Sequence, residues 1–106
     1  MSEKKLPTKI PKKFHWLFWD TNAAMFNPSK QPLYAINRLL DKGDEHAVGW
    51  VLQNFPEEMI KETLRKIRDF RFDTATFWAN YLDMPIKEVK CMQEPYKSMR
   101  KLHWSH

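Results

Sequence analysis

The sequence predicts an all-α fold: a small bundle of four to five short helices, with an extended aromatic segment before them and basic tails at both ends. Two observations support this class. Apolar residues recur at helical spacing through most of the chain, and its 106 residues include only two glycines. So few glycines leave little provision for the positive-φ turns of β-hairpins, which argues against an all-β fold. A chain of this length suits a single domain with one core.

The first expected helix spans residues 32–41, and the second follows directly. Pro32 suits an opening turn, and Gly43 supplies the stop. The apolar stripe of the first helix is Leu33, Ile36, Leu39 and Leu40. Asp44 is the expected N-cap of the second helix, because a side-chain oxygen there can accept hydrogen bonds from free backbone N–H groups. The inward stripe of that helix is Ala47, Trp50 and Val51.

The third expected helix spans residues 56–69, and a fourth begins at Asp73, which is its expected cap. The third helix should turn Ile60, Leu64 and Ile67 inward. The fourth is apolar nearly all round, so we expect it at the centre of the core. Its apolar residues are Ala75, Phe77, Trp78, Ala79, Tyr81 and Leu82. A short fifth helix is expected at residues 85–89.

Basic residues gather at the two ends of the chain. Residues 1–13 carry five lysines against one glutamate, and residues 85–106 carry five basic against two acidic groups. Residues 14–84 carry eight basic and ten acidic groups. We therefore divide the chain into a basic flexible arm (1–13), a helical domain (14–91) and a basic C-terminal tail (92–106). Ends of this kind are attracted to polyanions or to an acidic protein surface.

An aromatic run, residues 14–19, precedes the helices. It is too apolar to remain in water, so we expect its rings to dock across the helical core. Trp16 and Trp19, beside Lys12 and Lys13, also have the composition of a stacking platform for single-stranded nucleic acid. Of these two interpretations, anchoring in the core is favoured.

No motif of an active site or cofactor site is present, so we expect a non-catalytic protein without a cofactor. Cys91, His103 and His106 supply fewer ligands than a structural zinc site needs. The single cysteine fits a reducing compartment, and no apolar run approaches the roughly 20 residues of a membrane-spanning helix. A cytoplasmic protein is therefore expected.

Two groups of residues are candidates for binding a partner. Lys61, Arg65 and Arg68 share one sector of the third expected helix, where they could contact phosphates or an acidic protein. Most basic stripes of this kind are only solvated. The second group belongs to the C-terminal tail and consists of Lys97, Arg100, Lys101 and Trp104.

Several segments together resemble a known family. In chain order they are residues 17–20, Gly43-Asp44, residues 74–85, Cys91 and His103-Trp104. The pattern resembles a family of short bacterial proteins known only as a domain of unknown function, whose members are often encoded beside abortive-infection-type nucleotidyltransferase toxins. The resemblance implies a shared fold and an antitoxin-like role.

Our leading hypothesis is an antitoxin-like protein that binds and neutralises a partner nucleotidyltransferase, with a basic arm covering an acidic or substrate-phosphate surface of that enzyme. The alternative is a nucleic-acid-binding or autoregulatory protein that uses Lys61, Arg65, Arg68 and the N-terminal lysines for phosphate contacts. The alternative predicts a steep salt dependence. The oligomeric state stays open, since an aromatic-rich surface suits either a core or self-association.

Overall fold

The computed structural model describes residues 6–92, and these residues form helices and turns without a β-strand. In chain order the elements are the 3₁₀ helix η1 (Lys12–Leu17), the α-helices α1 (Pro32–Lys42), α2 (Glu45–Asn54), α3 (Glu57–Lys66) and α4 (Phe72–Tyr81), and the 3₁₀ turns η2 (Ile86–Glu88) and η3 (Lys90–Met92). The all-α prediction is confirmed, and the short helix expected at residues 85–89 is present as the turn η2. The tail residues Lys97, Arg100, Lys101 and Trp104 lie outside the described residues.

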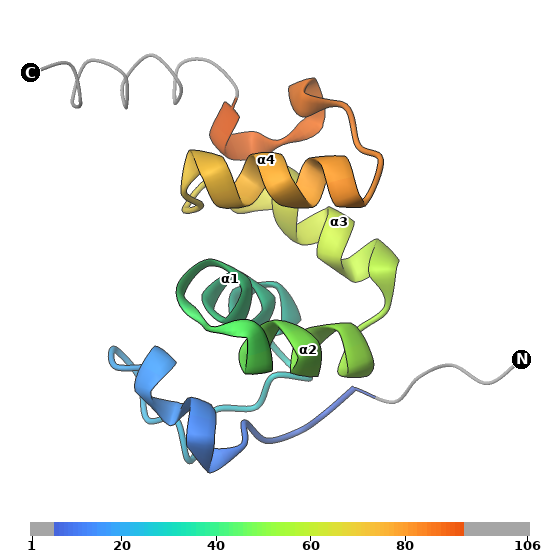
Figure 1. Ribbon diagram of the computed structural model, residues 1–106. Coiled ribbons are helices and arrows are strands. Elements are labelled where there is room, and N and C mark those ends of the chain that lie inside the picture. The colour runs from blue at the N-terminus through green and yellow to red at the C-terminus, as the bar shows by residue number, and fades with distance from the viewer. Residues whose placement is uncertain (1–5, 93–106) are drawn as a thin grey trace, which may run out of the picture.

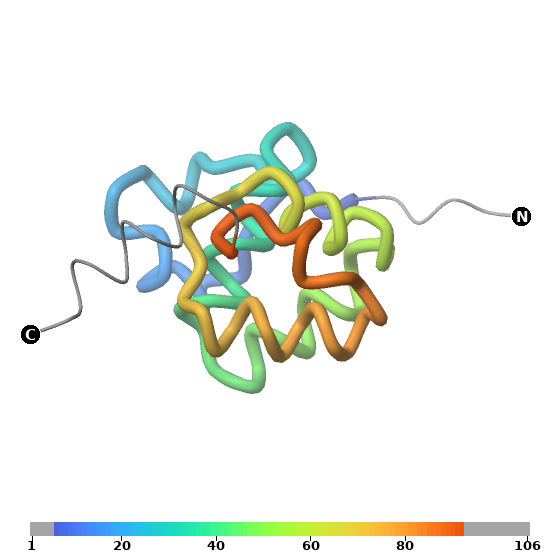
Figure 2. The backbone as a smooth tube through the Cα atoms, turned by 90° about the horizontal axis from the view of Figure 1, so that it is seen from above, coloured from blue at the N-terminus to red at the C-terminus, as the bar shows by residue number. Residues whose placement is uncertain are grey.

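The elements form two layers (Figure 1). The lower layer in this view holds η1, α1 and α2, and the upper layer holds α3, α4 and the two 3₁₀ turns. Helix α1 lies at the centre, because it packs against η1, α2 and α3. Seen from above, α4 runs along one edge of the upper layer, with η3 packed beside it (Figure 2). The central position expected for the fourth helix is therefore wrong, since α1 occupies it and α4 is peripheral.

Gly43 ends α1 for a steric reason and not for a conformational one. Its backbone is extended, with φ −87° and ψ 171°, so no positive φ requires a glycine there. A Cβ atom at this position would instead lie 2.4 Å from the Leu39 carbonyl oxygen and 2.5 Å from the Ala47 Cβ.

At the start of α2, the Asp44 carboxylate accepts hydrogen bonds from the His46 and Ala47 N–H groups, which confirms the predicted N-cap.

Helix α3 ends three residues before the predicted end at Asp69. The cause is tertiary, because side chains of α1 hold the following segment outside a helical path. Asn37 Nδ2 donates to the Asp69 carbonyl oxygen at 2.8 Å, and the Arg71 N–H donates to Asp41 Oδ1 at 3.0 Å. Asn37 and Asp41 are buried, so these hydrogen bonds satisfy polar groups that water does not reach. Arg68 consequently lies beyond the end of α3, so helical periodicity does not place it beside Lys61 and Arg65.

Helix α4 begins and ends with features that the sequence did not indicate. Its N-cap position is Arg71, since the α1 side chains already fix the chain there. Asp73 lies in the first turn, where its carboxylate accepts from the next N–H, so the cap predicted at Asp73 is wrong. At the other end, Asp83 takes a positive φ of 57°, and the Met84 N–H donates to the Ala79 carbonyl oxygen. This arrangement closes the helix in the manner usually provided by a glycine.

The aromatic N-terminal segment is helical and not extended. Phe14 and Leu17 are buried, because residues three apart lie on the same side of a 3₁₀ helix, and Phe18 follows them into the core. Trp16 and Trp19 remain on the outside, 59% and 66% exposed. The expected docking of the rings is therefore confirmed for the two phenylalanines and wrong for both tryptophans.

Candidate functional site

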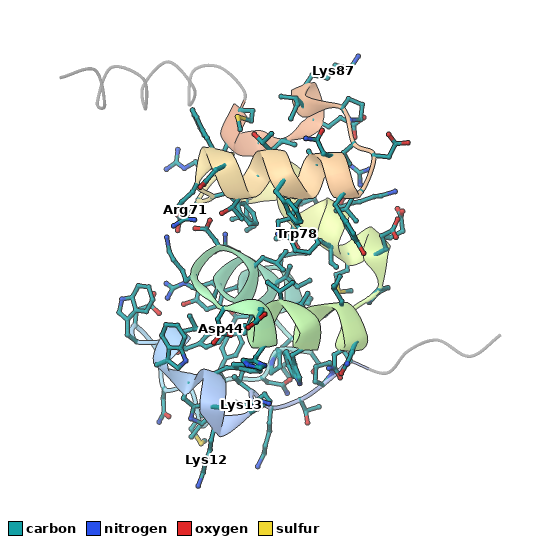
Figure 3. The ribbon with its side chains drawn as sticks, in the orientation of Figure 1. Lys12, Lys13, Asp44, Arg71, Trp78 and Lys87 are labelled. Atoms are coloured by element: carbon teal, nitrogen blue, oxygen red, sulfur yellow. The ribbon has the colours of Figure 1, made fainter. Side chains whose placement is uncertain are left out.

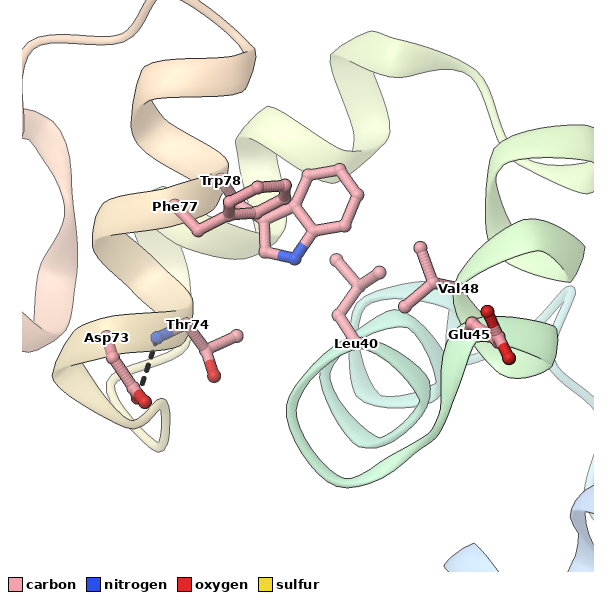
Figure 4. A pocket seen from close by; sticks show the side chains of 7 residues that line it. All are labelled: Leu40, Glu45, Val48, Asp73, Thr74, Phe77 and Trp78. Carbon is pink, nitrogen blue, oxygen red and sulfur yellow. Dashed lines mark hydrogen bonds between the residues drawn. The ribbon is translucent and has the colours of Figure 1, made fainter.

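An open cleft separates α4 from the α1–α2 pair (Figure 4). Leu40 of α1 and Val48 of α2 lie on one side of it, and Trp78 of α4 faces them. The cleft has a volume of about 380 Å³. Four of its seven lining residues are apolar, so the cleft suits apolar side chains of a ligand.

Two aromatic rings continue this apolar surface along α4. Phe77 lines the cleft, and Tyr81 lies one helical turn further on, so the two rings share one side of the helix. They stack with centroids 6.2 Å apart and planes 12° from parallel, and each meets Trp78 edge to face. Phe77 is 59% exposed and Tyr81 is 61% exposed. Large rings gathered in water next to a cleft mark a candidate binding surface; we call the cleft together with these two rings the α4 face.

Carboxylates stand at the edge of the cleft. Glu45 and Asp73 line it, and both residues are exposed. Asp73 lies 3.3 Å from the Nε of Arg71 in a pair that is open to water. An apolar floor with carboxylates beside it suits a ligand that combines apolar side chains with positive charge.

The basic residues predicted to bind a partner on α3 are paired with carboxylates. Lys61 lies 3.5 Å and 3.4 Å from the two glutamates of the first turn of its own helix. Arg65 lies 3.2 Å from Glu62 and 3.2 Å from Glu88. The hydrogen bond to Glu88, and then the one to Glu62, raises the pKa of Arg65. A phosphate would have to displace these carboxylates, so Lys61 and Arg65 do not form a free basic patch.

A second polar cluster joins α1 to the segment after η1, and it was not predicted. The Arg38 guanidinium donates to the Leu17 carbonyl oxygen at 3.1 Å and to the Asp20 carboxylate. The Tyr34 hydroxyl donates to the other Asp20 oxygen at 2.7 Å. The guanidinium also lies over the rings of Trp19 and Tyr34, 4.3 Å and 4.9 Å from their centroids. The one sequence signal for this cluster was the spacing of Tyr34 and Arg38, which share a side of α1.

The pKa values of Asp20 and Tyr34 are both shifted further from neutral pH. The hydrogen bond from Tyr34, together with Arg38, lowers the pKa of the Asp20 carboxyl below its ordinary value of 3.8. Burial, and then the hydrogen bond to Asp20, raises the pKa of Tyr34 above its ordinary value of 10.0. Neither group exchanges a proton near neutral pH, so the cluster acts as a clamp that positions Trp19 and the segment around it.

The described residues contain neither a cluster of metal ligands nor a membrane-spanning helix. Within residues 6–92, no group of three or more His, Cys, Asp or Glu side chains is arranged to hold a metal ion. Cys91 is buried, and the two histidines considered with it, His103 and His106, fall outside that range. The helices of the described part of the chain are too short or too polar for any of them to cross a bilayer.

The fold and the α4 face define a small all-α protein whose main candidate site is an open apolar cleft. Residues 14–64 match the model of a family of unknown function (DUF6922), in agreement with the expected resemblance to a domain of unknown function. The match covers most of η1, all of α1 and α2 and most of α3, and it ends before α4. No curated protein and no solved structure matches the chain.

Proposed function

We propose that this chain is a non-catalytic interaction protein that binds another protein on the α4 face. The observation that carries the proposal is the pair of stacked rings, Phe77 and Tyr81, left in water beside an apolar cleft. Burying a ring of this size stabilises a complex by about 1.5–3 kcal/mol. Aromatic anchors next to a desolvated pocket are the residues that dominate protein interfaces.

The partner we propose is a nucleotidyltransferase toxin of a bacterial cytoplasm, for which this chain acts as the antitoxin. Support comes from the resemblance to short bacterial proteins encoded beside such toxins. The α4 face adds a chemical requirement, because Glu45 and Asp73 stand beside its apolar floor. The segment bound there should present apolar side chains next to a lysine or an arginine.

The C-terminal tail supplies a second contact in this proposal. Lys97, Arg100 and Lys101 concentrate positive charge in a short stretch, and Trp104 follows them. Such a stretch suits an acidic or phosphate-binding surface of the enzyme. Replacing the three basic residues together by glutamate should weaken the complex, most strongly at low salt. An unchanged affinity would remove the tail from the mechanism.

The partner is identified by affinity capture of the tagged full-length chain from its native cells, with and without nuclease, followed by mass spectrometry. A nucleotidyltransferase that co-purifies in stoichiometric amount and resists nuclease is the expected result. Partners that disappear on nuclease treatment would favour the nucleic-acid alternative instead.

The site is then tested by calorimetry with the purified partner and the double variant Phe77→Ala/Tyr81→Ala. We expect an affinity loss of about 30-fold or more, the effect of removing one interface hot spot. The matched control is Trp16→Ala/Trp19→Ala, which removes two similarly exposed rings from the other layer. This control should bind as the wild type does. Equal losses in the two variants would contradict the assignment of the α4 face.

A further inference from the structure

A second exposed aromatic surface lies on the η1 side of the molecule. Trp16 belongs to η1 and Trp19 lies just beyond its end, and both are more than half exposed. Lys13 and Trp16 are three residues apart in a 3₁₀ helix, so they share one edge of it. We call the surface formed by Lys9, Lys12, Lys13, Trp16 and Trp19 the η1 face. The three lysines precede Trp16 within seven residues, and Trp19 lies against the Arg38 guanidinium, whereas the cleft of the α4 face is lined by carboxylates.

The positive charge of the η1 face is not neutralised. Lys9, Lys12 and Lys13 are exposed, and none of them forms an ion pair with a carboxylate of the described residues. Residues 6–43 contain only two carboxylates, and each is already paired with another basic group. Figure 3 shows Lys12 pointing outward from η1. Among the described residues of this part of the chain, a negatively charged ligand therefore meets no unpaired carboxylate.

The segment that carries these groups is held in place by the fold. Ile10, expected in the flexible arm, is buried, and its carbonyl oxygen lies 2.9 Å from the Nε2 of His15. Trp19 is covered on one side by the Arg38 guanidinium, which is itself anchored on the Leu17 carbonyl oxygen. Because Trp19 is 66% exposed, its other side is open to water. A ring whose orientation is already fixed loses little freedom when a ligand stacks on it.

We propose that the η1 face binds single-stranded nucleic acid, with bases stacked on Trp16 and Trp19 and phosphates contacted by the three lysines. Single strands fit better than a duplex, because only unpaired bases expose the faces on which an indole stacks. The lysines add an attraction that does not depend on base sequence and that weakens with salt. The site shares no residue with the α4 face, so this proposal is independent of the proposed function. It also places nucleic-acid binding away from Lys61 and Arg65, whose charges are paired.

The test is fluorescence anisotropy of the full-length protein with short labelled single strands of DNA and RNA, and with the duplex of the same length, at low salt. We expect the single strands to bind more tightly than the duplex and to quench tryptophan fluorescence. Trp16→Ala/Trp19→Ala should weaken binding by about tenfold or more per ring. Replacing Lys9, Lys12 and Lys13 by glutamine should flatten the log–log salt slope by about 2, since each phosphate contact on a single strand contributes about 0.7.

Two further variants keep the test decisive. Phe77→Ala/Tyr81→Ala removes the exposed rings of the α4 face and should leave oligonucleotide binding unchanged. Trp16→Ala alone should still cost about tenfold. This single variant leaves the contact between Trp19 and Arg38 intact, so its effect cannot arise from a disturbed clamp.

Three results would overturn the proposal: no binding of single strands at low salt, equal affinity for the duplex, or unchanged affinity in both tryptophan variants. Vesicles containing phosphatidylserine serve as the comparison ligand, because lysine and tryptophan also suit an anionic lipid surface. Binding to the vesicles without binding to the oligonucleotides is a case of the first of these results, and it would assign the η1 face to a lipid surface instead.

Discussion

The η1 face and the α4 face each leave two large aromatic rings more than half exposed, but the charges around these rings are opposite. The η1 face belongs to residues 6–43, which carry six basic and two acidic groups. The exposed rings of the α4 face belong to residues 44–92, which carry seven basic and nine acidic groups. Rings supply the contact area in both places, while the surrounding charge selects the ligand that approaches. Aromatic composition alone therefore says little about which ligand a face binds.

The basic residues of the two halves also differ in their pairing. On α3, Lys61, Arg65 and Lys66 each find a carboxylate three or four residues earlier in the same helix. Lys12 and Lys13 have no acidic residue three or four positions away on either side in the sequence. A basic stripe is thus a candidate phosphate site only when its helical neighbours leave it unpaired.

The largest effect is expected at Gly43, where the two halves join. A Cβ there would lie 2.4 Å from the Leu39 carbonyl oxygen and 2.5 Å from the Ala47 Cβ, so α1 and α2 would have to move apart. We expect Gly43→Ala to lower the free energy of unfolding by about 2–3 kcal/mol, the upper part of the range for overpacking. Urea denaturation measures the change. A midpoint equal to that of the wild type would show that the junction is looser than described.

The next effect is expected at the clamp of the basic half. Arg38→Ala removes hydrogen bonds to the Leu17 carbonyl oxygen and to Asp20, and it uncovers one side of Trp19. We expect the free energy of unfolding to fall by about 2 kcal/mol. Thermal denaturation of the variant and the wild type measures this change. Arg38→Lys should recover less than half of the loss, because an ammonium does not reproduce the two-pronged guanidinium contacts. Full recovery in the lysine variant would mean that charge alone holds the clamp.

A smaller effect of opposite sign is expected at the other glycine, in the acidic half. A Cβ at Gly49 would have no neighbouring atom within 4 Å, and the residue lies inside α2. Gly49→Ala should therefore raise the free energy of unfolding by about 0.5–1 kcal/mol, as helix propensity predicts. The same urea titration provides the measurement. A loss of stability would indicate that α2 needs flexibility at this position.

The smallest effect is the pH dependence that Asp20 contributes in the basic half. The folded pKa of Asp20 is lowered, so its contribution to stability is present above the unfolded pKa and is lost as pH falls through the folded value. Thermal midpoints of wild type and Asp20→Asn should differ at neutral pH and converge in acid. A difference that persists at the lowest pH would assign the effect to geometry and not to charge. Phe77→Ala serves as the control, since it should show no such convergence.

The helices α1 and α2 were predictable because their signals act within a few residues. Pro32 opens α1 at the expected position, and α1 extends only one residue beyond the predicted end. The Asp44 carboxylate makes the cap predicted for α2. Short-range chemistry of this kind is visible in sequence without knowledge of the fold.

The features that were missed depend on contacts between distant segments. The end of α3 is set by Asn37 and Asp41 of α1, and nothing between residues 66 and 69 marks it. The exposure of Phe77 and Tyr81 depends on which side of α4 packs on α3, and an apolar pattern does not specify that side. For the same reason, the sequence indicated basic residues as the candidate site and gave no indication of the cleft.

Cys91 offers a reporter of motion in the upper layer. Its thiol is buried in η3, which packs on α3 and α4, and the chain has no other cysteine. A thiol reagent can therefore react only when this turn opens, and the labelling rate measures the free energy of that opening. If labelling proceeds faster than global unfolding allows, the turn behind α4 opens as a separate unit. Because η3 packs on α4, this opening would loosen the helix that lines one side of the cleft, while the layer that holds η1, α1 and α2 stays folded.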